Sequence, residues 1–256
     1  MNILAIDTSS KNASVAILND KTVKLQMNNN DEKTHSQKIM PMIDEILNKT
    51  NLTLNDINLI SCCIGPGSFT GVRIGIATSK AFCDTKRISA VGVSSLESLA
   101  YQVNKEGIVC SIIDAGHGNV YAGLFELKLV NQEIKIINKH LMFLSLKDEN
   151  NTLTNKNLIN FIKNSKNTNN IDILNKNIYF IGDAAKIYKE LILSLILPNK
   201  IEVCEYCNSS ATFIGILGYM NYKEGNYGDS SILSPLYLRK SQAEIMLEEK
   251  TKNKIK

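Results

Sequence analysis

The chain has 256 residues, 44% of them hydrophobic and 21% charged, a balance typical of a globular protein with one large domain or two small ones. Its formal net charge of +4 is too small to indicate nucleic-acid binding by itself. No apolar run is long enough to span a bilayer, and residues 1–7 lack the basic segment and cleavage site of a signal peptide. We therefore expect a cytoplasmic protein that is not embedded in a membrane.

The first half of the chain predicts the element order β-β-β-α-β-α, extended by a further strand and helix. Hydrophobic periodicity and turn residues place strands at 3–7, 14–18 and 21–26, a helix at 35–48, a strand at 59–64, a helix at 69–82, a strand at 88–93 and a helix at 95–103. Ser94 and Glu97 form a capping-box pattern at the start of the last helix.

The second half predicts a looser version of the same order. Strands are expected at 108–113, 120–127, 133–138 and 178–181, with helices inside the Asn- and Lys-rich segment 150–177 and at 184–195 and 211–222. Element order alone therefore predicts an α/β duplication of two mixed sheets flanked by helices. We expect lobes at residues 1–105 and 106–256, with a late helix able to cross back to the first lobe.

The glycine-rich stretch from Gly65 to Gly75 lies between a predicted buried strand and a helix. It lacks the Lys of a phosphate-binding Walker loop, the following acid of a dinucleotide site and the spacing of a nucleophile elbow. Gly71, Gly75 and Ser79 recur every four residues and make one helix face smooth. Such a face allows a second helix to pack closely, either from the same chain or from a partner.

The other chemistry-bearing residues give weaker signals. The segment Asp7-Thr8-Ser9 can hold a metal-bound water or a nucleotide phosphate, but a capped turn is as reasonable locally. Cys204 and Cys207 form a lone C-x-x-C, which needs further ligands to bind zinc. The three histidines, His35, His117 and His140, show no ligand spacing, so no metal site is expected, and His35 is interpreted as structural or as a surface contact.

Five segments resemble the TsaB (YeaZ) family of bacterial tRNA threonylcarbamoyladenosine biosynthesis proteins. They are Ile3 to Ser9, His35 to Pro41, Gly65 to Gly75, Val91 to Glu97 and Pro235 to Arg239. The glycine-rich segment is similar to the long signature G-P-G-S-F-T-G-x-R-I-G. The resemblance covers about the first 125 residues closely, thins, and returns at the C-terminus.

The resemblance implies the actin-like (ASKHA, ribonuclease H-like) fold without catalytic activity. The catalytic paralogue, TsaD, binds a metal through H-x-x-x-H, where this chain has Ser95 and Leu99. The first turn, with its possible vestigial nucleotide site at Asp7, Thr8 and Ser9, lacks the phosphate-binding glycine. A second turn, usually D-A-R-x-G-E-V-Y, here carries Gly116, His117 and Asn119, so it lacks the Arg and Glu.

The resemblance also implies partners. TsaB-like proteins pair with TsaD through the first two helices, form homodimers through the same face, bind TsaE as a pair and act on tRNA through the complex. No cofactor is firmly implied for the chain itself, and ATP or ADP would bind only in the complex. The residues implied for the interface are His35, Ile39, Met42, Ile43, Ile46, Phe69, Gly71, Val72, Ile74, Gly75, Thr78 and Ser79. The alternatives are a glycoprotease-like enzyme, an actin-like ATP-dependent enzyme, or direct tRNA binding.

Overall fold

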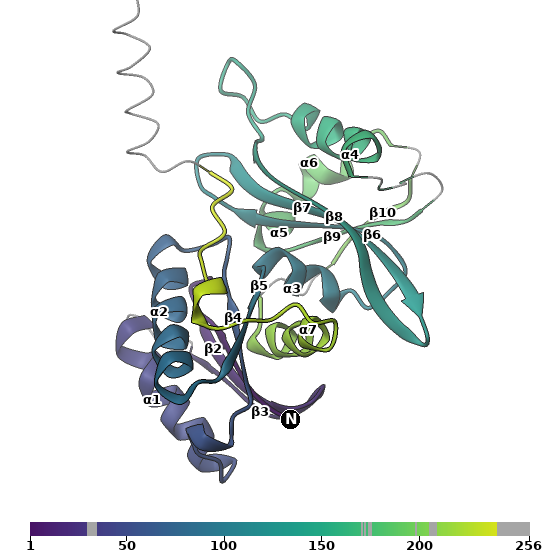
Figure 1. The fold of residues 1–256 in the computed structure, drawn as a ribbon. Helices are drawn as coiled ribbons and strands as arrows, with labels where there is room; N and C mark the ends of the chain where they lie inside the picture. Colours follow the sequence, from purple (N-terminus) through teal and green to yellow (C-terminus); the bar gives the residue numbers. More distant parts are fainter. Residues whose placement is uncertain are drawn as a thin grey trace, which may run out of the picture.

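The protein is built around two five-stranded mixed sheets, one in each lobe (Figure 1). The computed structural model describes residues 1–29, 35–169, 171, 173, 176–197, 199–204 and 209–239. The first sheet has the order β3-β2-β1-β4-β5 and the second β10-β9-β6-β7-β8. The first sheet comprises β1 (Asn2–Asp7), β2 (Ala13–Asn19), β3 (Thr22–Asn29), β4 (Leu59–Cys63) and β5 (Ser89–Val93). The second comprises β6 (Gly107–Asp114), β7 (Asn119–Val130), β8 (Glu133–Ser145), β9 (Ile178–Ile181) and β10 (Ile201–Val203).

The two sheets share one pairing scheme. In the first lobe β1 pairs antiparallel with β2 and parallel with β4, and in the second β6 pairs antiparallel with β7 and parallel with β9. The predicted α/β duplication with mixed sheets is therefore confirmed. The equivalent of β1 is β6, so the turns that follow these two strands occupy equivalent places.

Helices cover both faces of the first sheet. Helices α1 (His35–Lys49) and α2 (Phe69–Lys86) pack on one face, where Leu4 and Ile6 of β1 point. Helix α7 (Ala211–Lys223) packs on the other face against Ile3 and Ala5. Because successive residues of a strand face opposite ways, a strand covered on both sides must be apolar at consecutive positions, as β1 is from Ile3 to Ile6.

The approach of α7 is close because glycines face the sheet. A Cβ placed on Gly218 would overlap the Ser61 hydroxyl, and one on Gly215 would overlap Leu18. The Ser61 hydroxyl donates a 2.6 Å hydrogen bond to the Ile214 carbonyl. The chain thus returns from the second lobe to complete the first.

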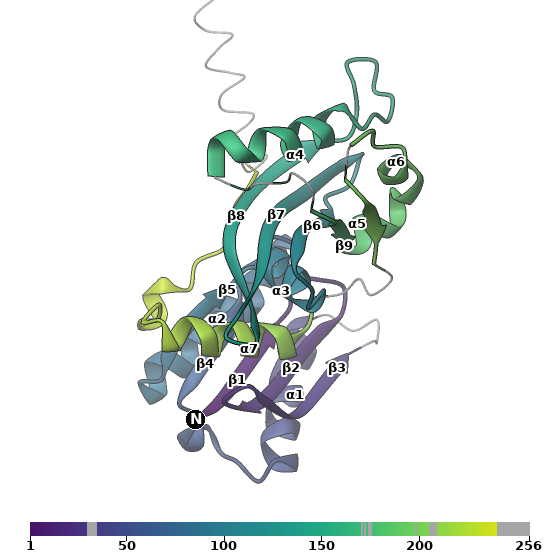
Figure 2. The ribbon, with the colours of Figure 1, turned by 90° about the vertical axis from the view of Figure 1, so that its right-hand side faces the viewer.

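The lobes meet at α3 (Ser95–Gln102) and along the long β7–β8 hairpin, which reaches down to α7 (Figure 2). Leu96 and Leu99 of α3 pack beneath β6 and β7 with Phe125. At the hairpin, ion pairs join Lys21 to Glu133, Lys135 to Glu224 and Lys139 to Glu97.

The second lobe differs from expectation in three places. The helix predicted at 184–195 is two short helices, α5 (Asp183–Ile187) and α6 (Lys189–Leu193), separated at Tyr188, whose φ of −106° and ψ of 27° are not helical. Strand β8 continues to Ser145, and the three-residue edge strand β10 was not expected. Helix α4 (Lys156–Asn169) occupies part of the predicted 150–177 segment, and the short 3₁₀ turns Leu54–Asp56 and Ser230–Ile232 complete the elements. Within the described residues, no helix combines the length and apolar character that a bilayer crossing requires.

Candidate functional site

The turn after β1 is closed by its own neighbours. Asp7 is 1% exposed, and its Oδ1 accepts hydrogen bonds from the Ser9 amide at 2.9 Å and the Ser9 hydroxyl at 2.7 Å. Its Oδ2 accepts a short hydrogen bond from the hydroxyl of Ser209, which lies two residues before the start of α7. A carboxylate that accepts this many hydrogen bonds needs no bound cation to be satisfied.

The glycine-rich loop closes the same turn from the other side. The Ser68 amide donates a 2.7 Å hydrogen bond to the Ser9 carbonyl, and a Cβ placed on Gly67 would overlap that carbonyl. The Ser68 side chain caps α2 by accepting from the Gly71 amide at 3.1 Å. The glycine at 67 is therefore required by close contact with the β1–β2 turn, and the loop sets the position at which α2 begins.

The small-residue face of α2 points into the lobe. Gly71, Gly75 and Ser79 are buried, the Thr8 hydroxyl donates a 2.7 Å hydrogen bond to the Gly71 carbonyl, and a Cβ on Gly75 would overlap that hydroxyl. The interpretation that these three residues clear a face for a partner is corrected accordingly. Gly71 and Gly75 allow α2 to lie close to β1 within the same chain, and Ser79 is buried beside Cys62 of β4.

The side chains expected at the interface on α1 are likewise turned inward. Ile39, Met42, Ile43 and Ile46 are buried in the core beneath the helix, because the same helical spacing that made them conspicuous places them against the sheet. On the opposite side of α1, Met40 is 50% exposed. His35 begins α1, but its side chain lies outside the described residues.

The remaining interface residues belong to α2 and divide by exposure. Val72 is buried, Ile74 and Thr78 are partly buried, and Phe69 is 54% exposed at the start of the helix. Their contact with a partner stays a prediction.

The equivalent turn of the second lobe is more open. Asp114 ends β6, and its Oδ1 accepts from the Gly116 amide at 3.2 Å. Gly116 has a φ of +76°, and nothing would lie within 4 Å of a Cβ placed there, so its left-handed backbone alone favours glycine. His117 is exposed, and the Asn119 side chain donates to the Gly116 carbonyl at 3.1 Å. The replacements at this turn therefore make local turn contacts.

Asp183 links this turn to the helix after β9. Its Oδ1 accepts from the backbone amides of Asp114 at 2.9 Å and Ala184 at 2.7 Å. Burial raises the pKa of the Asp183 carboxyl above its usual value, against these hydrogen bonds, which favour the charged form.

The positions that correspond to metal ligands in the paralogue are packed. The Ser95 hydroxyl donates a 2.5 Å hydrogen bond to the Pro66 carbonyl, and Leu99 lies in the core between the lobes. Among the described residues, no group of three or more His, Cys, Asp or Glu side chains is arranged to hold a metal ion. Cys204 is partly buried, and its C-x-x-C partner Cys207 lies outside the described residues.

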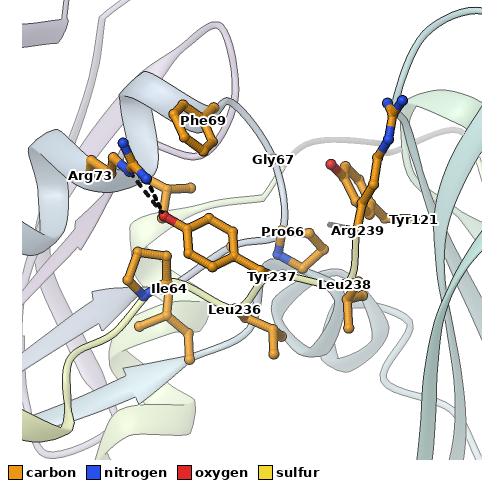
Figure 3. Close-up of a pocket in the computed structure, with 13 residues that line it drawn as sticks. Ile64, Pro66, Gly67, Phe69, Arg73, Tyr121, Leu236, Tyr237, Leu238 and Arg239 are labelled. Atoms are coloured by element: carbon orange, nitrogen blue, oxygen red, sulfur yellow. Dashed lines mark hydrogen bonds between the residues drawn. The ribbon is translucent and has the colours of Figure 1, made fainter. Parts of the chain in front are cut away.

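A cavity of about 500 Å³ opens beside the glycine-rich loop, between the lobes (Figure 3). It is lined by Ile64, Gly65, Pro66, Gly67, Phe69, Val72, Arg73, Tyr121, Pro235, Leu236, Tyr237, Leu238 and Arg239. These residues come from the end of β4, the loop and start of α2, from β7, and from the segment that follows the 3₁₀ turn at Ser230–Ile232.

Sequence reasoning missed Ser209 as a partner of Asp7, and Arg73, Tyr237 and Arg239 as pocket residues. The signal for the last three was present, because Arg73 and the Pro235–Arg239 segment belong to two of the recognised motifs. Ser209 and Ser210 precede a predicted helix, and serines in that position indicate a helix N-cap. They do not indicate the contact that Ser209 makes with Asp7, 202 residues away.

Two lobes with the same mixed-sheet pairing, a buried aspartate at the end of the first strand and a helix that returns to the first lobe define a duplicated, actin-like protein. Residues 28–247 match the family model described as TsaD, tRNA N6-adenosine threonylcarbamoyltransferase. The "tRNA threonylcarbamoyladenosine biosynthesis protein TsaB" of Bacillus subtilis is 30% identical over 246 residues, which cover 95% of this chain and 96% of that protein. The Escherichia coli protein of the same name is 40% identical over 124 residues, 47% of this chain and 53% of that one. The chain belongs to the TsaB (YeaZ) family, and it shares with TsaD the region that the family model covers.

The solved structures agree on the fold. A YeaZ structure from Pseudomonas aeruginosa superposes with a TM-score of 0.71 at 21% identity, covering 93% of this chain and 99% of that one. A ROK family protein from Streptococcus pneumoniae superposes with a TM-score of 0.51 at 10% identity, covering 88% and 100% of the two chains. At these identities the likeness concerns the fold alone.

Proposed function

We propose that this chain is a non-catalytic partner subunit of TsaD in the cytoplasmic formation of threonylcarbamoyladenosine in tRNA. The observation that carries the proposal is the inward bonding of Asp7. Its two carboxylate oxygens accept from Ser9 and Ser209, and the adjoining Ser9 carbonyl accepts from Ser68. An acid at this place that served a nucleotide or a metal would need a free oxygen facing a cavity.

The membership of the TsaB family supports the role in tRNA modification, since its named members are biosynthesis proteins for this nucleoside. On this proposal TsaE joins the pair, tRNA is bound by the complex, ATP or ADP binds only there, and a homodimer forms through the same face when TsaD is absent.

The outer sides of α1 and α2 are the proposed partner face. The two helices lie together on one face of the first sheet (Figure 1), and α1 exposes Met40 while α2 exposes Phe69, Arg73 and Ala77. Half-exposed apolar side chains on neighbouring helices suit a helical bundle with a partner. The proposed interface therefore uses the same two helices as the interface predicted from the sequence, but it consists of their exposed residues in place of the buried ones.

Reconstitution tests the proposal. The chain is purified with TsaD and TsaE from the same organism, and modification of tRNA is measured with and without it. We expect modification to require the chain. Modification that proceeds equally well without it contradicts the proposal, and nucleotide turnover by the chain alone, lost in Asp7→Asn, would favour an ATP-dependent enzyme instead.

A matched pair of variants tests the proposed face. Met40→Glu places a charge on α1, and Leu193→Glu places one on α6, where Leu193 is 54% exposed. We expect the first to weaken the complex with TsaD by about tenfold or more and the second to leave it unchanged. Equal affinities of the two variants, measured by analytical ultracentrifugation, would place the interface elsewhere.

A further inference from the structure

Two segments that lie far apart in the sequence, residues 64–73 and 235–239, build most of the pocket in Figure 3. The Leu236 amide donates a 2.8 Å hydrogen bond to the Ile64 carbonyl, where β4 ends. Arg73 donates two hydrogen bonds to the Tyr237 hydroxyl, from Nε at 2.9 Å and from Nη2 at 2.8 Å, across 164 residues of sequence. The pocket is therefore a fixed feature of the fold, made where two of the recognised motifs meet.

The pocket carries positive charge without compensation from its own walls. Its lining includes Arg73 and Arg239 but neither Asp nor Glu. Within the described part of the chain, neither guanidinium lies at ion-pair distance from a carboxylate. The Arg73 guanidinium stacks 3.8 Å from the centre of the Phe69 ring, and that of Arg239 lies 5.1 Å from the centre of the Phe143 ring. Stacking fixes the two cations while leaving charge available to an anion.

Aromatic rings form much of the remaining wall. Phe69 and Tyr237 lie with ring centres 6.0 Å apart, and Tyr121 stands on the opposite side beside Arg239 (Figure 3). Pro66 and Gly67 lie between these walls, so the floor is backbone and ring carbon. Ligand pockets are typically about 300–1,000 Å³, mostly apolar with a few placed polar groups, and this cavity fits that description.

We infer that this pocket binds a small organic anion, a carboxylate or phosphate attached to a planar or apolar body. Arg239 would hold the charged group, Arg73 on the opposite wall would add positive charge, and the rings would cover the planar body (Figure 3). A nucleic-acid strand is disfavoured, because its path needs a row of cationic side chains along an open groove, whereas this pocket is concave and has two. The pocket includes Gly67, which contacts the turn after β1, and it shares Phe69 and Arg73 with the proposed partner face. Its test uses this chain alone, so it does not depend on the proposed partnership with TsaD.

Binding to the full chain tests the inference, with phenyl phosphate and benzoate as probes for the phosphate and carboxylate forms. Calorimetric or ligand-observed NMR titration would compare them with inorganic phosphate, which lacks the ring, and benzyl alcohol, which lacks the charge. We expect at least one of the two combined probes to bind about tenfold more tightly than either part alone. Equal affinities for the charged part and the combined probe would reduce the site to non-specific anion binding and overturn the inference.

Variants locate the binding. Arg239→Gln removes an exposed cation and should weaken the better probe by about tenfold, since a charged hydrogen bond contributes on that scale. Lys189→Gln removes an exposed cation on α6 and should leave binding unchanged. Arg73→Gln should weaken binding of the same probe without changing the melting temperature of the protein. If the melting temperature falls, Arg239→Gln alone tests the inference. Equal binding by Arg239→Gln and Lys189→Gln, or tighter Arg239-dependent binding of a short single-stranded RNA, would overturn the inference.

Discussion

The two lobes end their first strands in the same residue and use it differently. Asp7 closes β1 and Asp114 closes β6, each before an antiparallel partner strand. Asp7 is buried and bonded to Ser9 and Ser209, whereas Asp114 is partly exposed and accepts from the Gly116 amide of its own turn. One backbone scheme thus supports a locked aspartate in one lobe and an open turn in the other.

The difference shows that contacts from other segments of the chain determine whether an aspartate at the end of a strand is buried or accessible. In the first lobe the Ser68 amide of the glycine-rich loop donates a hydrogen bond to the Ser9 carbonyl, and Ser209, just before α7, donates one to Asp7. In the second lobe the corresponding support comes from Asp183, which accepts the Asp114 backbone amide and leaves the Asp114 side chain at the surface. The predictions below break or sharpen this contrast, in order of expected effect.

The largest effect is expected from filling the close contact in the first lobe. Gly75→Val places methyl groups against the Thr8 hydroxyl and Ile6, and we expect a loss of about 3 kcal/mol or more in the free energy of unfolding. Ala77→Val, two residues along the same helix at an exposed position, should cost about 0.5 kcal/mol. Urea denaturation measures both, and similar losses would mean that α2 does not depend on its contact with β1.

The second effect compares the two aspartates directly. Asp7→Ala leaves the buried donors of Ser9 and the partly buried hydroxyl of Ser209 without their acceptor and should cost about 3 kcal/mol of unfolding free energy. Asp114→Ala removes a partly exposed acceptor and should cost about 1 kcal/mol or less. If thermal and urea unfolding give equal losses, the first turn is no more locked than the second.

The smallest effect, for a single residue and a rise of one pH unit, is a pH dependence that is stronger in the first lobe. Burial raises the pKa of Cys62 to about 12 and of Cys83 to about 11, and it raises the pKa of Cys63 too. The second sheet contains Cys110, whose pKa burial also raises. Because an unfolded thiol ionises near pH ~8.5, the stabilisation is fully present below that pH and is lost as pH rises toward the folded pKa, by up to about 1.4 kcal/mol per pH unit for each thiol.

A cysteine variant isolates this effect from other groups that titrate at high pH. The stability difference between the wild type and Cys62→Ala should shrink as the pH rises above about 9, because only the wild type loses the Cys62 contribution. A difference that stays constant with pH would contradict the assignment. The same comparison with Cys110→Ala reports on the second lobe.

Much of the fold could be predicted because local patterns determine it. The apolar runs of β1, β4 and β9 are buried on both faces, and the spacing of Ile39, Ile43 and Ile46 defines the inner side of α1. The break at Tyr188 could not be predicted, since the sequence on both sides remains compatible with a helix. The edge strand β10 has three residues, too few for an alternating pattern to stand out.

The site was harder to predict, because its contacts join distant segments. A helical pattern identifies an apolar side but does not say whether that side meets the sheet or a partner, and on α1 it meets the sheet. The small side of α2 posed the same question, and Thr8 answers it. Conversely, Arg73 and Tyr237 meet through an arrangement that neither motif reveals alone.

The return of α7 to the first sheet has a consequence for the order in which the protein is made. Residues 2–93 supply every strand of the first sheet, yet the apolar face formed by Ile3, Ala5 and Val91 is covered by residues 211–223. During synthesis on the ribosome, the lobe whose strands emerge first therefore waits for residues 211–223, which are made after every strand of the second sheet. The second sheet, complete at residue 203, has all its strands before then. The lobe that is synthesised first is thus the later of the two to have all its elements available for folding.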